Sequence, residues 1–317
     1  MKWWIPLVLA ALAPVQALAQ AWPSRAVKLV VPYPPGGPTD IVARVVAERL
    51  QAQTGQPFIV DNRPGAGGNL GAEAVAKSPA DGYTLLVATT AHAINKSIFK
   101  NLNYDVQKDF IPVSLLTQGP LVLVVHPDIP ARSVSELIAM AKAKPKSLSF
   151  ASSGNGQSTH LSGELFASMA GAPMTHVPYK GSAPALNDVI AGHVPLMFDT
   201  MLSAMPQVKG GKLRALAITG AQRSPVAPDL PTIAESLPGY QVYAWNALLV
   251  PVATPAAVTA RLSEELKAVL AQPAVQQKFA AQGFAATWTA PAETSNFVQA
   301  EVEKWARTVQ LSGAKVD

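Results

Sequence analysis

Five segments rich in glycine and short polar side chains hold the residues of this chain that could do chemistry. They are residues 34–40, 63–69, 89–95, 152–160 and 179–182. Backbone N–H groups and the side chains of Ser, Thr and Asn bind carboxylate and phosphate oxygens, and glycine lets a ligand approach the main chain. Any one of these segments has the composition of an ordinary turn or helix cap. All five together favour a binding site for a small anion.

Motifs for catalysis and for cofactors are incomplete. Ala66 replaces the first glycine of a dinucleotide-binding pattern, and no P-loop lysine follows a glycine segment. Residues 156–160 depart from the G-x-S-x-G nucleophile motif at the last position. The histidines lack the spacing of metal ligands; they are His92, His126, His160, His176 and His193. The sequence therefore predicts no catalytic residue, metal or cofactor. The alternative is an exported, esterase-like hydrolase that uses Ser158 or Ser153 with His160 as its base.

Short apolar runs precede these segments, and helical patterns alternate with them. The expected strands are residues 27–31, 58–60, 84–88, 148–151, 174–178, 195–198 and 213–219. The expected helices are residues 41–53, 133–143, 158–170, 182–191, 255–270 and 292–311, with a short one that ends at 77. Strands that alternate with helices are typical of the α/β class with parallel strands. The five segments would then lie at the carboxyl ends of strands, where open α/β sheets bind ligands and helix N-termini expose unpaired N–H groups.

Two long apolar stretches, residues 110–125 and 240–250, interrupt this alternation because no helical pattern divides them. They predict extended chain that crosses between two lobes. One lobe would comprise residues 20–121 together with 244–317, and the other residues 122–243. Two crossings of this kind allow hinge closure around a ligand.

Composition and charge narrow the class of protein. The chain has 317 residues, of which 49% are hydrophobic and 14% charged, and it contains no cysteine. These values exclude a disordered chain, a disulfide scaffold and thiolate metal sites. The formal net charge is +5, but the basic residues are scattered and their densest cluster spans only residues 142–146. Because a nucleic-acid-binding protein shows a basic stripe with interleaved aromatic residues, no nucleic-acid partner is expected.

The amino-terminal segment predicts export. Lys2 gives a basic start, residues 3–14 are mostly apolar, and Ala17-Leu18-Ala19 matches an A-x-A cleavage site. This pattern is typical of a signal peptide that comprises residues 1–19. Cleavage after Ala19 would leave Gln20 as the first residue of the exported protein.

The polar segments and the residues around them resemble the Bug-type proteins, which are the periplasmic substrate-binding components of tripartite tricarboxylate transporters. The resemblance rests on Val31–Asp40, Asn62–Asn69, Ala151–Gly156 with His160-Leu161 and Glu164–Phe166, Val177–Gly181 and Met197–Asp199, in the order and at the spacing of that family. It implies a two-lobed periplasmic-binding-protein fold of type II, the Venus-flytrap fold. Each lobe would be a mixed sheet flanked by helices, and two hinge crossings would join the lobes.

The resemblance also implies a function. The protein would be a periplasmic, non-catalytic monomer that captures a small mono- or dicarboxylate, aromatic acids included. It would deliver this ligand to the membrane permease subunits of a tripartite transporter. A ligand sensor that serves a two-component system is an alternative with the same kind of site.

The resemblance assigns ligand-binding positions in both lobes. In the first lobe they are Tyr33, Gly36, Gly37, Thr39, Ala66, Gly67, Thr89, Thr90, His92 and Asn95. In the second lobe they are Ser153, Asn155, Ser158, His160, Tyr179 and Asp199. For Asp199 two interpretations stay open, because a buried carboxylate is costly unless it is paired. It either meets an amine or hydroxyl of the ligand or holds a loop or the hinge.

Overall fold

The structure is a computed structural model that describes residues 22–314, so the predicted signal peptide lies outside the described residues. The α/β class is confirmed. The strands are β1 (Val27–Val31), β2 (Phe58–Asn62), β3 (Thr84–Thr89), β4 (Phe110–Val125), β5 (Ser149–Ser152), β6 (Thr175–Pro178), β7 (Leu196–Thr200), β8 (Arg214–Ile218), β9 (Tyr243–Pro251) and β10 (Ala285–Ala286).

The helices lie between these strands and at the carboxyl end of the chain. They are α1 (Pro38–Thr54), α2 (Asn69–Ala76), α3 (Thr90–Ile98), α4 (Val134–Ala143), α5 (Ser158–Ala170), α6 (Ser182–Ile190), α7 (Met201–Lys209), α8 (Ala256–Leu270), α9 (Pro273–Ala280) and α10 (Pro291–Ser312). Two short 3-10 helices, η1 (Ala66–Gly68) and η2 (Ile233–Glu235), complete the set.

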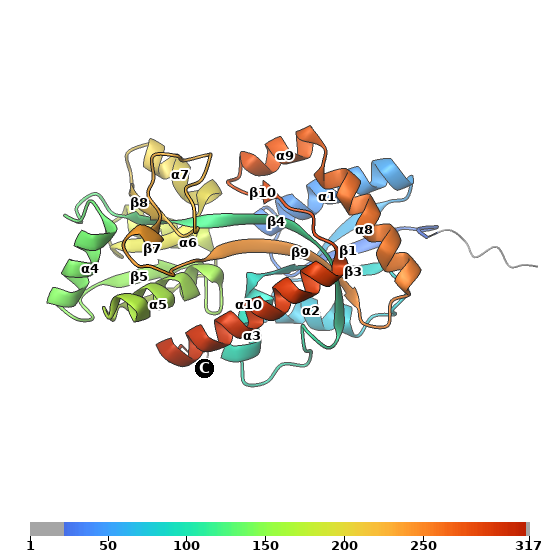
Figure 1. The fold of residues 1–317 in the computed structure, drawn as a ribbon, viewed down its shortest axis with the longest axis horizontal. Helices are drawn as coiled ribbons and strands as arrows, with labels where there is room; N and C mark the ends of the chain where they lie inside the picture. The colour runs from blue at the N-terminus through green and yellow to red at the C-terminus, as the bar shows by residue number, and fades with distance from the viewer. Residues whose placement is uncertain (1–21, 315–317) are drawn as a thin grey trace, which may run out of the picture.

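The two long strands β4 and β9 connect two sheets. β1 pairs in parallel with β2 and β3, and β3 pairs antiparallel with β9. Residues 110–120 of β4 pair with β9, whereas residues 121–125 pair with β7, beside which β5 and β6 follow in parallel. We call β1, β2, β3, β9, β10 and the first part of β4 the first sheet, and β5 to β8 with the last part of β4 the second sheet. Figure 1 shows β4 and β9 running side by side through the middle of the molecule.

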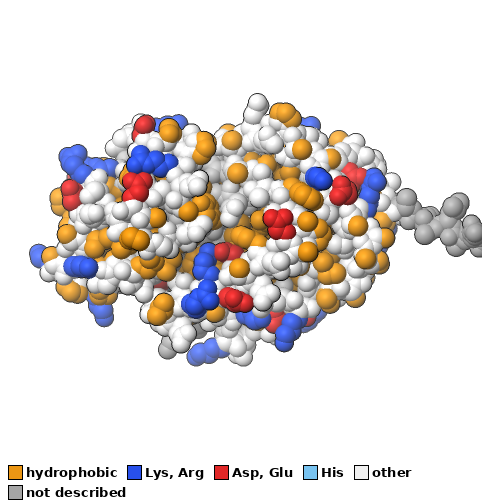
Figure 2. Space-filling view, in the orientation of Figure 1, with side chains coloured by type: hydrophobic (Ala, Val, Ile, Leu, Met, Phe, Trp, Pro, Cys, Tyr) orange, Lys and Arg blue, Asp and Glu red, His pale blue; other side chains and the backbone are white. Residues whose placement is uncertain are grey.

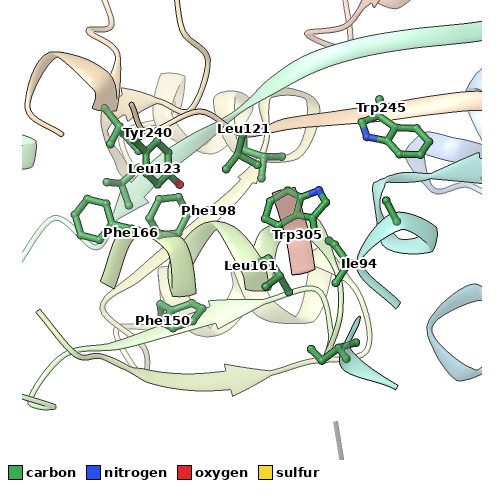
Figure 3. Packing of buried hydrophobic residues seen from close by; sticks show 14 of the residues in the cluster. Ile94, Leu121, Leu123, Phe150, Leu161, Phe166, Phe198, Tyr240, Trp245 and Trp305 are labelled. Atoms are coloured by element: carbon green, nitrogen blue, oxygen red, sulfur yellow. The ribbon is translucent and has the colours of Figure 1, made fainter. Parts of the chain in front are cut away.

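Large apolar side chains from both sheets, α5 and α10 form one buried cluster. Trp245 of β9 and Trp305 of α10 lie in one cluster with Phe150, Phe166 and Phe198 of the second sheet and α5, as Figure 3 shows. All five side chains are almost completely buried, and each such burial contributes roughly 2–3 kcal/mol to folding. Helix α10 packs against both α3 and α5, and therefore contacts elements beside both sheets.

The face drawn in Figure 2 carries no large patch of one charge. Lys and Arg side chains are scattered there among hydrophobic and acidic ones, and on this face they form no continuous basic stripe. This arrangement agrees with the scattered basic residues of the sequence.

Three helices, α3, α7 and α9, differ from the sequence-based expectation. Helices α7 and α9 were not expected, because α7 contains Pro206 and α9 is only eight residues long. Residues 89–95 were expected as a loop, but α3 begins at Thr90. A capping box begins this helix: the Thr89 side chain accepts from the backbone of residue 92, and the His92 side chain accepts from the backbone of residue 89. The usual sequence signal for that motif is Glu or Gln, not His.

Candidate functional site

The polar segments lie at the carboxyl ends of strands in both sheets. β1 leads into α1, β2 into η1 and α2, and β3 into α3; in the second sheet β5, β6 and β7 lead into α5, α6 and α7. The first N–H groups of each helix have no acceptor within that helix and carry partial positive charge. Gly37 is the N-cap of α1 and has no capping side chain, and Pro38 begins the helix. These helix starts therefore suit an anionic ligand.

Three segments of the first sheet meet around Tyr33. Its hydroxyl lies 2.8 Å from Oγ1 of Thr89, and the Thr89 N–H donates to Nδ1 of His92 over 3.0 Å. Gly68, from the segment after β2, is in the left-handed region and approaches both side chains. A β-carbon on Gly68 would lie 3.2 Å from the Tyr33 hydroxyl and 3.3 Å from Nε2 of His92. The residue before it, Gly67, accepts a 3.1 Å hydrogen bond from Nδ2 of Asn95.

The titratable groups of this cluster are neutral near pH 7. Burial lowers the pKa of His92 to about 4, although hydrogen bonds to backbone groups of Thr89 and Gly68 oppose the shift. Burial likewise raises the pKa of Tyr33 to about 12, against hydrogen bonds with Thr89 and Gln157. Since Nδ1 of His92 accepts from the Thr89 N–H, the ring proton is assigned to Nε2, which faces Gly68. The first sheet thus offers neutral donors instead of full charges.

Asp40 fixes the loop that precedes α1. Its carboxylate accepts from the Gly36 N–H at 2.9 Å, from Nε of Arg44 at 2.8 Å and from Nδ2 of Asn62 at 3.0 Å. Partial burial raises the pKa of Asp40, but these hydrogen bonds outweigh that effect and hold it below its usual value. Asp40 is not among the ligand-binding residues predicted from the sequence. Its position in the first turn of a helix was the available signal.

The segment after β5 is held by side chains of α5 and β6. The Ser153 N–H and hydroxyl lie 2.9 and 2.8 Å from Oγ1 of Thr159. Nδ1 of His160 accepts from the Gly156 N–H at 3.3 Å, and the His160 ring stacks on His176 with ring centres 3.8 Å apart. The Gly181 N–H also donates to the Ser153 carbonyl, which joins the segments after β5 and β6.

This geometry does not support the hydrolase alternative. A nucleophilic serine needs a hydrogen bond of about 2.6–3.2 Å to its base. The ring nitrogens of His160 instead face the Gly156 N–H and the Glu164 carboxylate, and the Ser153 hydroxyl pairs with Thr159.

Asp199 is a buried carboxyl group at the end of β7. Its Oδ1 accepts from the Ser182 hydroxyl at 2.7 Å and from the Thr200 N–H at 2.8 Å, whereas Oδ2 has no partner in the part of the chain that the structure describes. Burial raises the pKa of Asp199 to about 7, although the same two hydrogen bonds act in the opposite direction. One oxygen therefore holds the start of α6, and the other is free to meet a further group.

The predicted site residues differ in exposure and in what they contact. The buried ones are Thr90, His92, Asn95, His160 and Asp199; the exposed ones are Gly36, Ala66 and Asn155; the half-buried ones are Tyr33, Gly37, Thr39, Gly67, Thr89, Ser153, Ser158 and Tyr179. Tyr33, Gly67, Thr89, His92 and Asn95 come together in one cluster. The Thr90 hydroxyl accepts from the backbone N–H of Trp245, and the Tyr179 hydroxyl donates to Asp188 at 2.5 Å. Both hydroxyls therefore already have hydrogen-bond partners within the protein.

The two sheets meet where Gly156 approaches α3. A β-carbon at Gly156 would lie 2.9 Å from Oδ1 of Asn95. Neither Gly68 nor Gly156 was assigned from the sequence, because a close approach between distant segments leaves no local pattern.

Comparison with known proteins supplies the family. Residues 42–313 match the model of TctC, the tripartite tricarboxylate transporter family receptor. The chain belongs to this family. Protein BugT of Bordetella pertussis (strain Tohama I) is 40% identical over 307 residues, which cover 96% of this chain and 94% of BugT.

Solved structures of similar proteins have the same fold as this chain. R. palustris Rpa4515 with adipate has a TM-score of 0.86 and 39% identity, and the match covers 93% of this chain and all of that one. MatC (Rpa3494) from Rhodopseudomonas palustris with bound malate has a TM-score of 0.82 and 35% identity, over 91% of this chain and all of that one. The periplasmic binding protein BugD has a TM-score of 0.83 and 34% identity, over 93% of this chain and 99% of BugD.

Membership of the tripartite tricarboxylate transporter receptor family confirms the Bug-type resemblance and the periplasmic-binding-protein fold. Proteins of this family are periplasmic solute-binding receptors, not enzymes, which confirms the interpretation as a binding protein. Across residues 22–314, no helix combines the length and the apolar character that crossing a bilayer requires.

Proposed function

We propose that this receptor captures a small mono- or dicarboxylate between two lobes and delivers it to the permease subunits of a tripartite transporter. The observation that carries the proposal is that segments at strand ends of both sheets meet. Gly156, in the segment after β5, lies against Asn95 of α3, the helix that follows β3. The lobes would comprise residues 20–121 with 244–317 and residues 122–243. β4 supports this division, since it pairs with β9 up to Pro120 and with β7 from Leu121 onward.

The donors at these strand ends suit a carboxylate. The site residues assigned from the resemblance include no Lys or Arg, and His92 is neutral because burial lowers its pKa to about 4. Backbone N–H groups at helix starts and the hydroxyls of Tyr33, Thr89 and Ser153 are left as the donors. Such dipoles bind an anion without a buried cation. The adipate of Rpa4515 and the malate of MatC are ligands of the same chemical class.

Calorimetric titration of the mature protein tests the ligand class. Adipate and malate are the first probes, and adipamide, which has the same chain as adipate without charge, is the matched control. We expect a carboxylate to bind and adipamide not to bind. A ligand at 100 times its Kd also stabilises the fold by about 2.7 kcal/mol, so a thermal-shift screen extends the test to aromatic and monocarboxylic acids. Equal binding of adipate and adipamide would contradict the proposal.

Export, oligomeric state and transport need separate measurements. N-terminal sequencing of protein recovered from the periplasm should begin at Gln20, and light scattering should give the mass of a monomer. Uptake of a labelled ligand should be lost when the gene is deleted. Normal uptake, with loss of a ligand-induced transcriptional response instead, would favour the sensor alternative.

A further inference from the structure

The backbone of Gly156, in the segment after β5, lies directly against α3 because glycine has no side chain. It is buried and has a φ of +73°. A β-carbon there would lie 2.9 Å from Oδ1 of Asn95, 3.5 Å from Cγ2 of Ile98 and 3.6 Å from Cε2 of Phe99, all from α3 or its end. The first distance is too short for a carbon and an oxygen, and the other two are ordinary contacts.

Asn95 has little freedom to move away. Its Nδ2 donates to the Gly67 carbonyl at 3.1 Å and to Oδ1 of Asn69 at 2.7 Å. The same oxygen of Asn69 accepts from the Tyr104 hydroxyl at 2.8 Å, so Asn69 is itself held. Since Asn95 is completely buried, turning its amide would break hydrogen bonds that water could not replace.

Gly156 is fixed from its own side as well. Its N–H donates to Nδ1 of His160, whose ring stacks on His176, and His176 stacks in turn on Phe150. His176 in turn lies 2.6 Å from the Ser152 hydroxyl through its Nε2. The contact between Gly156 and Asn95 therefore joins two braced parts of the molecule.

We propose that Gly156 is a positioning residue that sets how closely the two lobes approach each other around the ligand. It does so because glycine has no β-carbon, which lets its backbone lie against Asn95. The inference rests on the proposed function, because it presupposes lobes that close. A methyl group at residue 156 would hold the lobes apart. Asn155 and Ser158, two proposed ligand-binding residues, flank Gly156 and would be displaced with it.

Distances between spin labels test this proposal. The chain has no cysteine, so cysteines placed at the exposed residues Gln51 of α1 and Lys142 of α4 can be labelled selectively. Gly171→Ala is the matched control for Gly156→Ala. Gly171 ends the helix that Gly156 precedes, its φ of +57° gives alanine a similar backbone strain, and no atom lies within 4 Å of its β-carbon position.

We use closed for the arrangement of this structure, in which Gly156 lies against Asn95. We expect Gly156→Ala to lower the population at the label distance of this arrangement about tenfold, with Gly171→Ala within about twofold of the parent protein. Asn95→Ala combined with Gly156→Ala should restore the closed population, because it removes the clashing oxygen. Asn95→Gln lengthens the side chain that faces Gly156 and leaves the glycine unchanged, so it should also lower that population. It keeps the test decisive if Gly156→Ala does not fold.

The opposite results would overturn the proposal. They are equal closed populations in the two alanine variants, no restoration by Asn95→Ala, or a parent protein that never shows the closed distance with or without adipate. If neither adipate nor malate binds, the proposed ligands are wrong, and the comparison of ligand-free distance distributions still decides the role of Gly156.

Discussion

The hydroxyl groups of Tyr33 and Thr89 lie 2.8 Å apart, although the two residues are separated by 56 positions in the sequence. Their contact joins the ends of β1 and β3, which pair in parallel. Burial raises the pKa of Tyr33 to about 12, so its hydroxyl keeps its proton and remains a donor. The side chain of Gln157, from the segment after β5, also interacts with this hydroxyl. Tyr33 thus connects the first sheet to the second.

Removal of the Tyr33 hydroxyl should weaken ligand binding. Tyr33→Phe keeps the ring but loses one hydrogen bond, worth about 1 kcal/mol, so we expect the affinity for adipate to fall roughly fivefold. Calorimetry measures the change. Tyr83→Phe is the control, because the Tyr83 hydroxyl lies beside exposed Ser24, away from the cluster around Tyr33. An unchanged affinity in Tyr33→Phe, or an equal loss in Tyr83→Phe, would contradict this role.

Asp199→Asn should change stability in a pH-dependent way. Burial raises the pKa of Asp199 to about 7, whereas in the unfolded chain the group ionises near pH 4. Between these values the folded state holds a proton that the unfolded state has lost, so this group makes the protein less stable as pH rises. The variant cannot ionise. We expect it to be more stable than the parent at pH 8, by at most about 4 kcal/mol, and similar at pH 4.

Urea unfolding at pH 4.5, 6 and 8 measures this difference. Asp188→Asn on α6 is the control, because the hydrogen bond from Tyr179 and the neighbouring His193 lower the pKa of Asp188. It should show no gain toward alkaline pH. A difference between Asp199→Asn and the parent that does not vary with pH would show that Asp199 ionises normally.

His92 should make the protein sensitive to acid. Burial lowers its pKa to about 4, while the unfolded chain takes up the proton near pH 6.5. The stability present above pH 6.5 is therefore lost as pH falls toward 4, by up to about 3 kcal/mol for this group. His92→Gln removes the titration and keeps a residue that can complete the capping box with Thr89.

The pH profile of unfolding in the two proteins tests this prediction. Burial and the neighbouring His160 lower the pKa of His176 to about 3, so His176 contributes a loss of the same sign to both proteins. Only the difference between the profiles reports on His92. Parallel profiles between pH 6.5 and 4 would contradict the assignment.

The strands and the positions of the polar segments could be predicted because their signals are local. Residues 27–31 and 158–170 form the strand and the helix that apolar runs and flanking glycines indicate. The long stretch 110–125 is a single strand that pairs in both sheets. Helix α3 was missed because a histidine completes its cap, and α7 because a proline lies inside it.

The contacts within the site depend on distances that the sequence does not contain. Gly68 matters because its backbone fits against Tyr33 and His92, and Gly156 because it fits against Asn95. Other glycines of the polar segments, such as Gly36, have no such contacts, so the sequence does not distinguish the glycines that matter. The ligand-binding assignments taken from the resemblance stay predictions, and for Tyr179 the hydrogen bond to Asp188 gives the hydroxyl a structural partner.

Glu301 should be important for stability, because one carboxylate oxygen serves two tryptophans. Its Oε2 accepts from Nε1 of Trp245 at 2.9 Å and from Nε1 of Trp305 at 3.0 Å, and Lys304 contacts its other oxygen. Glu301→Leu leaves two buried indole N–H groups without an acceptor, which costs about 2–5 kcal/mol. Glu301→Gln keeps an acceptor oxygen and should cost about 1 kcal/mol.

Urea unfolding followed by tryptophan fluorescence measures both variants, with Glu303→Leu on the exposed side of α10 as the control. Because Trp245 lies on the crossing strand β9 and Trp305 on α10, the leucine variant should also change the near-ultraviolet circular dichroism of the folded protein. If Glu301→Leu is no less stable than Glu301→Gln, the hydrogen bonds to the two indoles add nothing to the packing of α10. The attachment of α10 to β9 would then depend on apolar contacts such as that of Trp245 with Phe297.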